Sequence, residues 1–453
     1  MKCWVGVLAM MGSGMALAQA PAIPMSETEV AAPAMPSILP LRDQAMLIDA
    51  NLRERLDTLI PTLMREQGVQ MWIVGAREYF EDPVTASMLD AESFHARRRT
   101  ILVFFDPGAG KPVERLTVSR YGLGGLFASS WDPARQPDQW QAVADIVAAR
   151  DPNTIAINTS ELSAFADGMT HSQYLAFTRA LPAKYRQRLV SGETLSVRWL
   201  ETRTPDEMRL YPGIVRMAHA LIAEAFSRKV ITPGKTTSDD VVWWYRQRLN
   251  QLGLATWFQP SIGIQRQGAT GMLEGDTVIQ PGDLLWTDFG IAYLRLNTDT
   301  QHLAYVLKRG ETAAPAGLRA GLAQTNRVQD MLLASFRAGA SGNDVLAAAR
   351  AKAKAAGIET AIYSHPLGFH GHGAGSAIGF WDNQNGDERG AYAIRPHTTW
   401  SIELTSYAAV PEWGGQRVDF RSEEDAYFDG ERVRYLDGRQ TELTLIPAEA
   451  NAP

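Results

Sequence analysis

The spacing of apolar residues in the first half of the chain switches between a helical and a strand period. From 43 to 67 apolar residues recur every three or four positions, which is the period of an amphipathic helix. Further on, short runs rich in β-branched and aromatic residues are typical of buried strands. The expected strands cover 69–74, 100–105 and 154–158, and further helices are expected at 137–149 and 173–187. This alternation predicts an α/β domain over 43–195.

A polar stretch after Gly192 precedes a second region with its own pattern. Thr204-Pro205-Asp206-Glu207 combines an N-cap residue, a proline for the first turn and two acids beside the positive end of the helix dipole. It therefore predicts the start of a helix. Expected helices cover 206–228, 238–252 (capped by Ser238), 313–338 and 343–356, with strands after the second and after the fourth. We predict a second domain of helices and strands over 196–453.

Two aspartates lie where a solvated loop would not place them. Leu284 to Asp288 is an apolar, β-prone run, and Asp299 follows eleven residues later. We interpret 284–299 as two strand segments that each end in a carboxylate. A buried carboxylate costs free energy unless a proton, a cation or a hydrogen-bond donor offsets its charge, and two carboxylates also repel each other. A divalent metal ion relieves both problems.

The composition is that of a globular protein with room for two cores. The chain has 453 residues, of which 45% are apolar. Its 44 basic and 50 acidic residues give a formal charge of −6 with no block of one sign, so a nucleic-acid partner is not expected.

The first twenty residues have the features of a secretory signal. Lys2 precedes an apolar run that ends at Leu17, and Ala18-Gln19-Ala20 supplies a small-residue cleavage pattern. Residues 21–42, rich in Ala, Pro and Met, are the expected spacer. We predict an exported protein, periplasmic or secreted, with no membrane partner after cleavage. Cys3 is the single cysteine and would leave with the signal, so no disulfide is expected.

Three histidines and two glutamates supply further candidate ligands. His365, His370 and His372 lie among glycines, which permit positive φ and close approach of the backbone to a ligand. This cluster is either a metal or substrate loop or a surface loop with incidental histidines. Glu403 ends a β-prone run and Glu423 precedes an apolar stretch, and each of them read alone is a solvated surface group.

The order of these residues resembles the pita-bread metallopeptidases, which include methionine aminopeptidase, aminopeptidase P and prolidase. The resemblance is carried by Asp-Phe-Gly at 288–290, Asn-Thr-Asp at 297–299, His-Pro-Leu-Gly at 365–368 with a second histidine seven residues after the first, and Arg-Ser-Glu-Glu-Asp at 421–425. The first domain and the Thr-Pro-Asp-Glu-Met start of the second resemble the aminopeptidase P, prolidase and creatinase branch. It implies a creatinase-like N-terminal α/β domain followed by an α+β pita-bread catalytic domain.

The resemblance also implies a dinuclear metal site with a bridging water. The implied ligands are Asp288, Asp299, His365, Glu403 and Glu423. Hard oxygen ligands with one imidazole suit manganese, zinc, cobalt or iron(II), and manganese is the first choice.

Other residues receive roles beside this metal site. The resemblance implies that Glu403 is the general base, that His372 hydrogen-bonds the substrate and that Arg421 orients a carboxylate ligand. His370 is a candidate substrate contact, and Trp381 and Trp413 are candidates for contact with an apolar substrate.

The chain departs from the Xaa-Pro enzymes at three places. Those enzymes carry one histidine before the first metal aspartate, where 269–274 here has none, and one four residues before the metal histidine, where this chain has Ala361. Their glutamate strand continues Pro-Gly, whereas this chain reads Leu404-Thr405. These departures leave hydrolysis expected and proline specificity open. Creatinase loses the metal ligands instead, so creatine hydrolysis is not favoured.

We therefore predict an exported dinuclear metallopeptidase that hydrolyses short peptides, with Xaa-Pro bonds as the first substrates to test. One alternative is a pita-bread enzyme that acts on a non-peptide bond, such as an organophosphate ester or a small metabolite. The other is a non-catalytic binding protein on the same fold. A homodimer is an open possibility.

Overall fold

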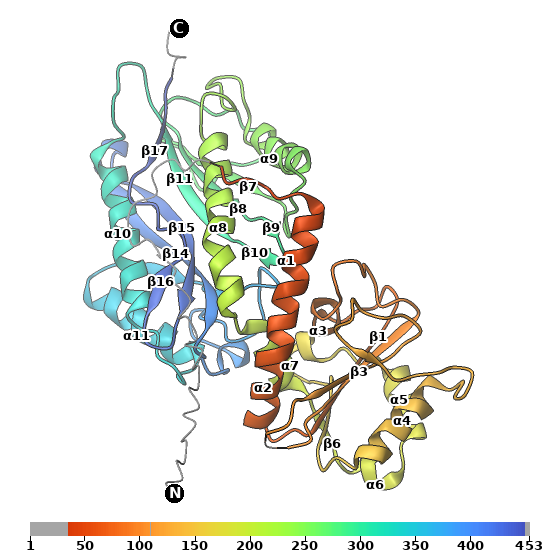
Figure 1. The fold of residues 1–453 in the computed structure, drawn as a ribbon. Helices are drawn as coiled ribbons and strands as arrows, with labels where there is room; N and C mark the ends of the chain where they lie inside the picture. The colour runs from red at the N-terminus through yellow and green to blue at the C-terminus, as the bar shows by residue number, and fades with distance from the viewer. Residues whose placement is uncertain (1–34, 109, 449–453) are drawn as a thin grey trace, which may run out of the picture.

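The computed structural model describes residues 35–108 and 110–448 (Figure 1). The predicted signal at 1–20 and residues 21–34 of the predicted spacer lie outside the described residues. In the part that is described, no helix has the length and apolar character needed to cross a membrane.

The first helical segment packs against both halves of the molecule. It comprises α1 (Leu41–Glu54), a π-helical turn (Arg55–Leu59) and α2 (Ile60–Glu66), which confirms the helix predicted from 43 to 67. Leu47 and Ile48 pack on the core of the second half, whereas Leu56 and Leu63 lie in a core of the first half. In Figure 1 this segment, in red, passes alongside α8 and reaches down to the smaller half.

The first half is built on a six-stranded mixed sheet with the order β4-β3-β2-β1-β5-β6. Its strands are β1 (Met71–Arg77), β2 (Arg99–Phe105), β3 (Glu114–Val118), β4 (Ala128–Ser129), β5 (Ile155–Ile157) and β6 (Leu189–Ser191). β1 is antiparallel to β2 and parallel to β5. The helices are α3 (Pro83–Ser87), α4 (Gln139–Arg150), α5 (His171–Ala180), α6 (Ala183–Arg186) and α7 (Glu193–Glu201).

The three predicted strands and the helix at 137–149 are confirmed here, with shifts of at most three residues at their ends. The single helix predicted over 173–187 is wrong: it is two helices, α5 and α6, because Pro182 interrupts the helical hydrogen bonding. The stretch after Gly192 is the helix α7, and Leu195 and Trp199 of α7 are buried in the first half. The predicted limit at 195 falls within α7, and the domain ranges stay a prediction.

Four long helices belong to the second half: α8 (Pro205–Ala225), α9 (Ser238–Leu252), α10 (Ala316–Leu333) and α11 (Gly342–Ala355). Thr204 and Glu207 form the predicted cap of α8 as a reciprocal capping box. The cap of α9 is Thr237, which accepts a hydrogen bond from the Asp240 amide, so the predicted Ser238 cap is wrong by one residue. The helix predicted over 313–338 is confirmed in a shorter form, since it starts after Pro315 and ends at Leu333.

A nine-stranded sheet forms the centre of the second half, with the order β12-β14-β15-β11-β8-β7 and three further strands at its margins. Its strands are β7 (Ser261–Gln265), β8 (Leu284–Phe289), β11 (Thr300–Val306), β12 (Thr360–Ile362), β13 (His365–Leu367), β14 (Thr398–Val410), β15 (Gln416–Phe428), β16 (Val433–Tyr435) and β17 (Thr444–Ile446). The short hairpin of β9 (Ala292–Tyr293) and β10 (Leu296–Asn297) lies between β8 and β11. In Figure 1, α8 and α10 flank this sheet. The predicted fold class, an α/β domain followed by an α+β pita-bread domain, is confirmed.

Candidate active site

The five predicted ligands come together near the centre of the nine-stranded sheet. Glu403 on β14 lies directly opposite Glu423 on β15, and His365 opens β13 at the other edge of β14. Asp288 is the penultimate residue of β8. Asp299 immediately precedes β11, so the expectation that it ends a strand is wrong: the β9–β10 hairpin delivers it to the start of the next strand.

The distances between these groups suit shared cations. His365 Nε2 lies 3.6 Å from Asp299 Oδ2, 3.8 Å from Glu423 Oε1 and 4.0 Å from Glu403 Oε2. Two atoms bonded to one ion at about 2.1 Å lie roughly 3–4 Å apart, depending on the bond angle. Ligand atoms of His365, Glu403 and Glu423 form one group within 4.8 Å, and those of Asp288, Asp299 and Glu423 form another. Glu423 belongs to both groups, which is the arrangement that a pair of ions needs.

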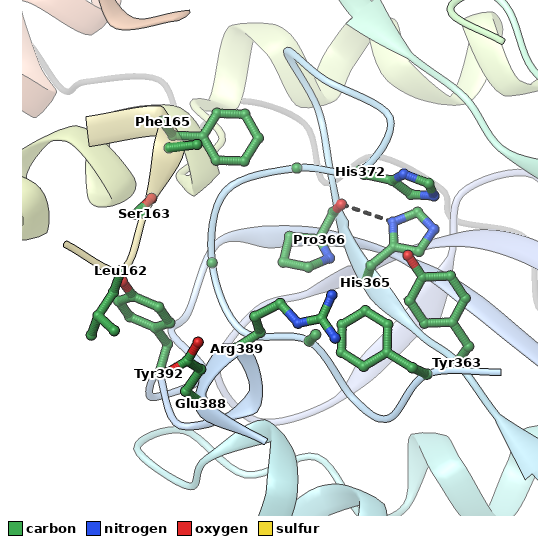
Figure 2. A pocket seen from close by; sticks show the side chains of 15 residues that line it. Leu162, Ser163, Phe165, Tyr363, His365, Pro366, His372, Glu388, Arg389 and Tyr392 are labelled. Carbon is green, nitrogen blue, oxygen red and sulfur yellow. Dashed lines mark hydrogen bonds between the residues drawn. The ribbon is translucent and has the colours of Figure 1, made fainter. Parts of the chain in front are cut away.

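The His365 ring is held as a neutral ligand. Its Nδ1 lies 3.1 Å from the carbonyl oxygen of Pro366, which can only accept a hydrogen bond, so Nδ1 carries the proton (Figure 2). Burial, and then the charge of His372, lower the pKa of His365 to about 3. Nε2 therefore presents a lone pair to the carboxylates, and a neutral imidazole next to them forms no ion pair.

The carboxylates crowd each other without a cationic neighbour in hydrogen-bonding contact. Burial, and then the charge of Asp288, raise the pKa of Asp299 well above its usual range, and burial followed by Asp299 does the same for Glu423. Burial raises the pKa of Glu403 to about 8 and that of Asp288 to about 7. Divalent cations would replace the protons that these groups otherwise retain.

Three buried atoms of the site have no hydrogen-bond partner among the described residues: Asp288 Oδ1, Asp299 Oδ1 and His365 Nε2. Unpaired buried polar atoms are rare because each costs about 1–3 kcal/mol. Four carboxylates with one imidazole form a donor set for hard or borderline divalent ions. The residues present fit a metal centre, and their individual roles as ligands stay a prediction.

Gln301 on β11 is a site residue that sequence reasoning missed. Its Nε2 donates to Glu403 Oε1 and to Glu423 Oε2, both at 2.8 Å, while Trp286 Nε1 donates to its Oε1 at 2.9 Å. One amide thus fixes the orientation of both glutamates. The signal was available, because Gln301 lies two residues after Asp299 and strand alternation places both on one face. Ser401 donates a further hydrogen bond to Glu423 Oε1.

Hydrogen bonds to backbone carbonyl oxygens join the segment before Asp299 to the loop that carries His370 and His372. The side chain and the amide of Asn297 both donate to the carbonyl oxygen of Gly368, at 2.9 and 2.8 Å. Trp257 Nε1 donates to the Thr298 carbonyl oxygen at 3.0 Å, and its ring packs on Gly371, where an added Cβ would lie 2.0 Å from it. The predicted use of glycine for close approach therefore applies here, although the neighbour is a protein side chain.

The structure places Arg421 in the wall of a cavity that Asp288, Asp299, Glu403 and Glu423 also line, here called the metal cavity. No hydrogen bond joins it to the five ligand side chains within the described chain, and its guanidinium stacks on Trp286 at 4.9 Å. Its charge lowers the pKa values of Asp288 and Glu403. Arg421 thus acts on the carboxylates by charge, and the hydrogen bonds that orient Glu403 and Glu423 come from Gln301 and Ser401.

The other candidate substrate residues separate into two groups. Trp381 and His372 line the metal cavity, and the His372 ring lies 4.7 Å from that of His365. His370 lines neither this cavity nor the second cavity that adjoins it. The His370 ring packs 5.0 Å from the ring of Phe165 of the first half. Trp413 is 5% exposed and belongs to a hydrophobic core, so its candidacy as a substrate contact is wrong.

Two cavities meet at the site. One, of about 400 Å³, contains Asp288, Asp299, Glu403 and Glu423 in its wall, and the other, of about 330 Å³, adjoins it through Tyr363 and His372. Figure 2 shows the second cavity, with His365 and His372 on one side and Leu162, Ser163 and Phe165 of the first half on the other. These volumes are in the range of small-molecule binding sites, roughly 300–1,000 Å³.

Comparison with solved structures shows proteins of similar fold. The fold is similar to the X-Pro aminopeptidase of Thermotoga maritima (14% identity, TM-score 0.58, 85% of this chain and 99% of that chain). It is also similar to the Xaa-Pro dipeptidase of Bacillus anthracis (17%, 0.53, 88% and 99%) and the prolidase of Pyrococcus horikoshii (12%, 0.54, 88% and 99%). No curated protein sequence matches the chain.

The fold and the site together define a class, the two-domain pita-bread hydrolases of the aminopeptidase P and prolidase branch. Residues 213–422 match the model of metallopeptidase family M24. The protein is a metallopeptidase, and the resemblance inferred from the sequence is confirmed.

Proposed function

We propose that this metallopeptidase hydrolyses short peptides, Xaa-Pro bonds among them, with two divalent ions held by Asp288, Asp299, His365, Glu403 and Glu423. The observation that carries the proposal is the pair of overlapping ligand groups that share Glu423. When bound, such ions polarise the scissile carbonyl and make water a nucleophile at neutral pH. Manganese is the first metal to test.

Glu403 is the ligand best placed to move a proton. Its side chain is 22% exposed to the cavity, whereas those of Asp299 and Glu423 are 5% and 1% exposed. Gln301 holds its Oε1, and its Oε2 has no hydrogen-bond partner among described residues. Glu403 would take a proton from the attacking water at Oε2 and pass it to the departing amine.

His372 is the group best placed to contact the substrate. Its ring belongs to the walls of both cavities, so a peptide that extends from one to the other passes it. Trp257 contacts the ring edge-on at 5.0 Å, which restricts its orientation. We expect His372 to donate a hydrogen bond to the substrate carbonyl oxygen.

Support for short substrates comes from the wall that the first half contributes. Leu162, Ser163 and Phe165 line the far side of the second cavity, opposite His365 (Figure 2). A long chain that extended from the metal cavity in this direction would meet these residues.

Export is proposed from the sequence pattern of residues 1–20 and from the single cysteine, Cys3, and cell fractionation with a carboxyl-terminal tag tests it.

The test is a peptide panel on protein stripped of metal and reloaded with manganese, cobalt or zinc. Cleavage of Ala-Pro and Ala-Pro-Ala, abolished in Asp288→Asn, is the expected result. Cleavage of Ala-Ala and Ala-Ala-Ala alone would keep the peptidase and remove the proline preference. If two ions are bound and no peptide in a broad panel is cleaved, the proposal is wrong.

Ala361 favours a second candidate. It lies in the wall of the metal cavity at a position where, by the resemblance, Xaa-Pro enzymes carry a histidine. A methyl group at this place gives room without a hydrogen-bond donor, which suits a different scissile group such as an organophosphate ester. Turnover of a paraoxon-type ester that exceeds all peptide turnover would favour this candidate.

A further inference from the structure

A strongly basic cavity lies in the first half of the molecule, in a different set of residues from the metal centre. Its volume is about 370 Å³, and its lining consists of Trp131, Gln139 and five arginines: Arg77, Arg97, Arg98, Arg99 and Arg120. Within the described chain none of the five arginines pairs with a carboxylate. Arg65, Arg115 and Arg150 of the same half each do, at 3.0, 2.8 and 2.6 Å. The cavity therefore concentrates cationic charge in a protein whose formal charge is −6.

Sheet register brings three of these arginines together. Arg77 ends β1 and lies directly opposite Arg99, which begins β2. Arg120 follows two residues after Val118, which pairs with Ile101, so it emerges from β3 at the same end of the sheet. Like charges directly opposite each other destabilise a sheet. The sequence nevertheless places an arginine on each of three neighbouring strands at this end.

Two acidic side chains close in sequence to cavity residues accept hydrogen bonds from backbone amides and not from the guanidinium groups. Glu78 accepts a hydrogen bond from the backbone amide of Arg98 at 3.0 Å. Asp138 caps α4 by accepting from the Trp140 and Gln141 amides. Burial, and then the charge of Arg77, lower the pKa of Arg99, although Asp138 opposes this shift. Arg99 Nε is buried and has no hydrogen-bond partner among the described residues.

Aromatic rings hold the guanidinium planes. Arg97 stacks over Tyr121 at 4.6 Å and Arg120 over Trp131 at 5.6 Å, while Arg99 lies over Trp140 at 5.5 Å. Stacking occupies the face of a guanidinium and leaves the N–H groups at its edge free to donate. Arg97 and Arg98 also have left-handed backbone conformations, with φ of 33° and 66°, which are uncommon for arginine. Three of the five guanidinium groups thus contact rings, and none of the five donates a side-chain hydrogen bond within the described chain.

We propose that this cavity binds a small anion that carries at least two phosphate groups. Guanidinium groups bind phosphate through paired N–H donors, and several guanidinium groups exceed what a single carboxylate neutralises. The volume suits a small molecule and not a polymer. The proposal does not rest on the peptidase function, because no residue of this cavity lines the metal site.

Calorimetric titration of the full chain with pyrophosphate and with tripolyphosphate tests the proposal. Titrations in EDTA exclude ligand held by metal. We expect saturable binding to one site, weakened at least about tenfold in the double variant Arg97→Gln/Arg120→Gln, since each lost guanidinium removes charge-assisted hydrogen bonds. The control is Arg135→Gln/Arg179→Gln, which removes two exposed arginines outside the cavity. Circular dichroism confirms that both double variants are folded.

A parallel arm identifies the source of the phosphates. Vesicles that contain cardiolipin present two phosphates on one headgroup, and flotation measures their binding. Binding to pyrophosphate that only the cavity variant loses supports a soluble ligand, and binding to vesicles alone, lost in the same variant, supports a lipid headgroup. Absence of binding in both arms, or equal binding by both double variants, overturns the proposal.

Discussion

The two faces of the strands β11 and β15 differ in what compensates the charge of their buried carboxylates. Glu423 faces the metal cavity and receives hydrogen bonds from the neutral groups of Gln301 and Ser401. The next residue, Glu424, faces α8 and contacts His219 at 3.1 Å and His302 at 3.0 Å. Burial alone would raise the pKa of Glu424, but the two histidines bring it down to about 2.

The difference shows where the compensating cation comes from. Asp437 and Glu424 overcome the effect of burial on His219 and raise its pKa to about 9, so this face supplies its own positive charge. Ligand atoms of His219, His302 and Glu424 also lie within 4.8 Å of one another, but their contacting nitrogens are already hydrogen-bonded. Potential metal-ligating atoms without a hydrogen-bond partner occur on the face toward the metal cavity, so a metal is expected there.

Loss of a ligand on the metal face should have the largest effect. Asp299→Asn removes one negative charge from the centre, and we expect kcat to fall by about a thousandfold or more, since metal ions contribute several kcal/mol to catalysis. Stopped assays at saturating manganese measure it. Asp276→Asn, an exposed aspartate outside the site, is the control. A loss of less than tenfold in Asp299→Asn would remove this aspartate from the ligand set.

Breaking the ion cluster on the opposite face should cost stability in place of activity. Glu424→Ala leaves His219 and His302 without their shared partner, and the free energy of unfolding should fall by about 3–5 kcal/mol. Urea unfolding of the metal-free protein measures the change. The metal content of the folded fraction should stay the same. A variant that keeps its stability and loses metal would show that the cluster is a metal site, and the comparison above would fail.

Removal of the amide that orients both glutamates should have an intermediate effect. Gln301→Ala leaves Glu403 and Glu423 free to turn, and metal affinity should fall about 10–100-fold, as is usual when a partner of a ligand is lost. Competition with a fluorescent chelator measures the affinity. Trp286→Phe, which removes the donor to Gln301 together with part of the ring on which Arg421 stacks, should shift the affinity in the same direction by less. Unchanged affinity in both variants would mean that the amide does not position the ligands.

The pH dependence of stability should also differ between the two faces, and we expect this effect to be the smallest. Asp288 and Glu403 have raised pKa values, about 7 and about 8, so their protonated forms stabilise the metal-free protein fully below their ordinary pKa values, and this stability is lost as pH rises toward 7 and 8. The raised pKa of His219 gives stability that is lost only as pH rises through about 9. The Tm gain on adding manganese should therefore widen between about pH 5 and pH 8. A constant gain would contradict this assignment.

Much of the site could be predicted because its ligands lie on elements with clear periodicity. Asp288 and Glu403 lie in β-prone runs, Glu423 precedes an apolar stretch, and His365 lies close to glycines. Strand alternation also places Gln301 on the face of the ligands. An amide side chain does not by itself indicate a metal site, because its role becomes clear only beside the charged ligands that it contacts. Periodicity does not separate His370 from His372 because loop residues have no fixed period; the structure separates them, since His372 lines both cavities and His370 packs against Phe165.

The fold was predictable to the level of its long elements. Short strands such as β4 and β6 have too few residues to show alternation, and β3 is only partly buried. The basic cavity was hidden for a different reason. Arg77 and Arg120 lie 43 positions apart, and only the register of β1, β2 and β3 brings them to one end of the sheet.

Metal titration of two variants at adjacent positions tests the central claim most directly. Calorimetry on metal-free protein should give two manganese ions per chain in the natural sequence and in Glu424→Gln. Glu423→Gln should bind at most one with measurable affinity, because Glu423 belongs to both ligand groups. Two ions retained in Glu423→Gln, or binding lost in Glu424→Gln instead, would contradict the account.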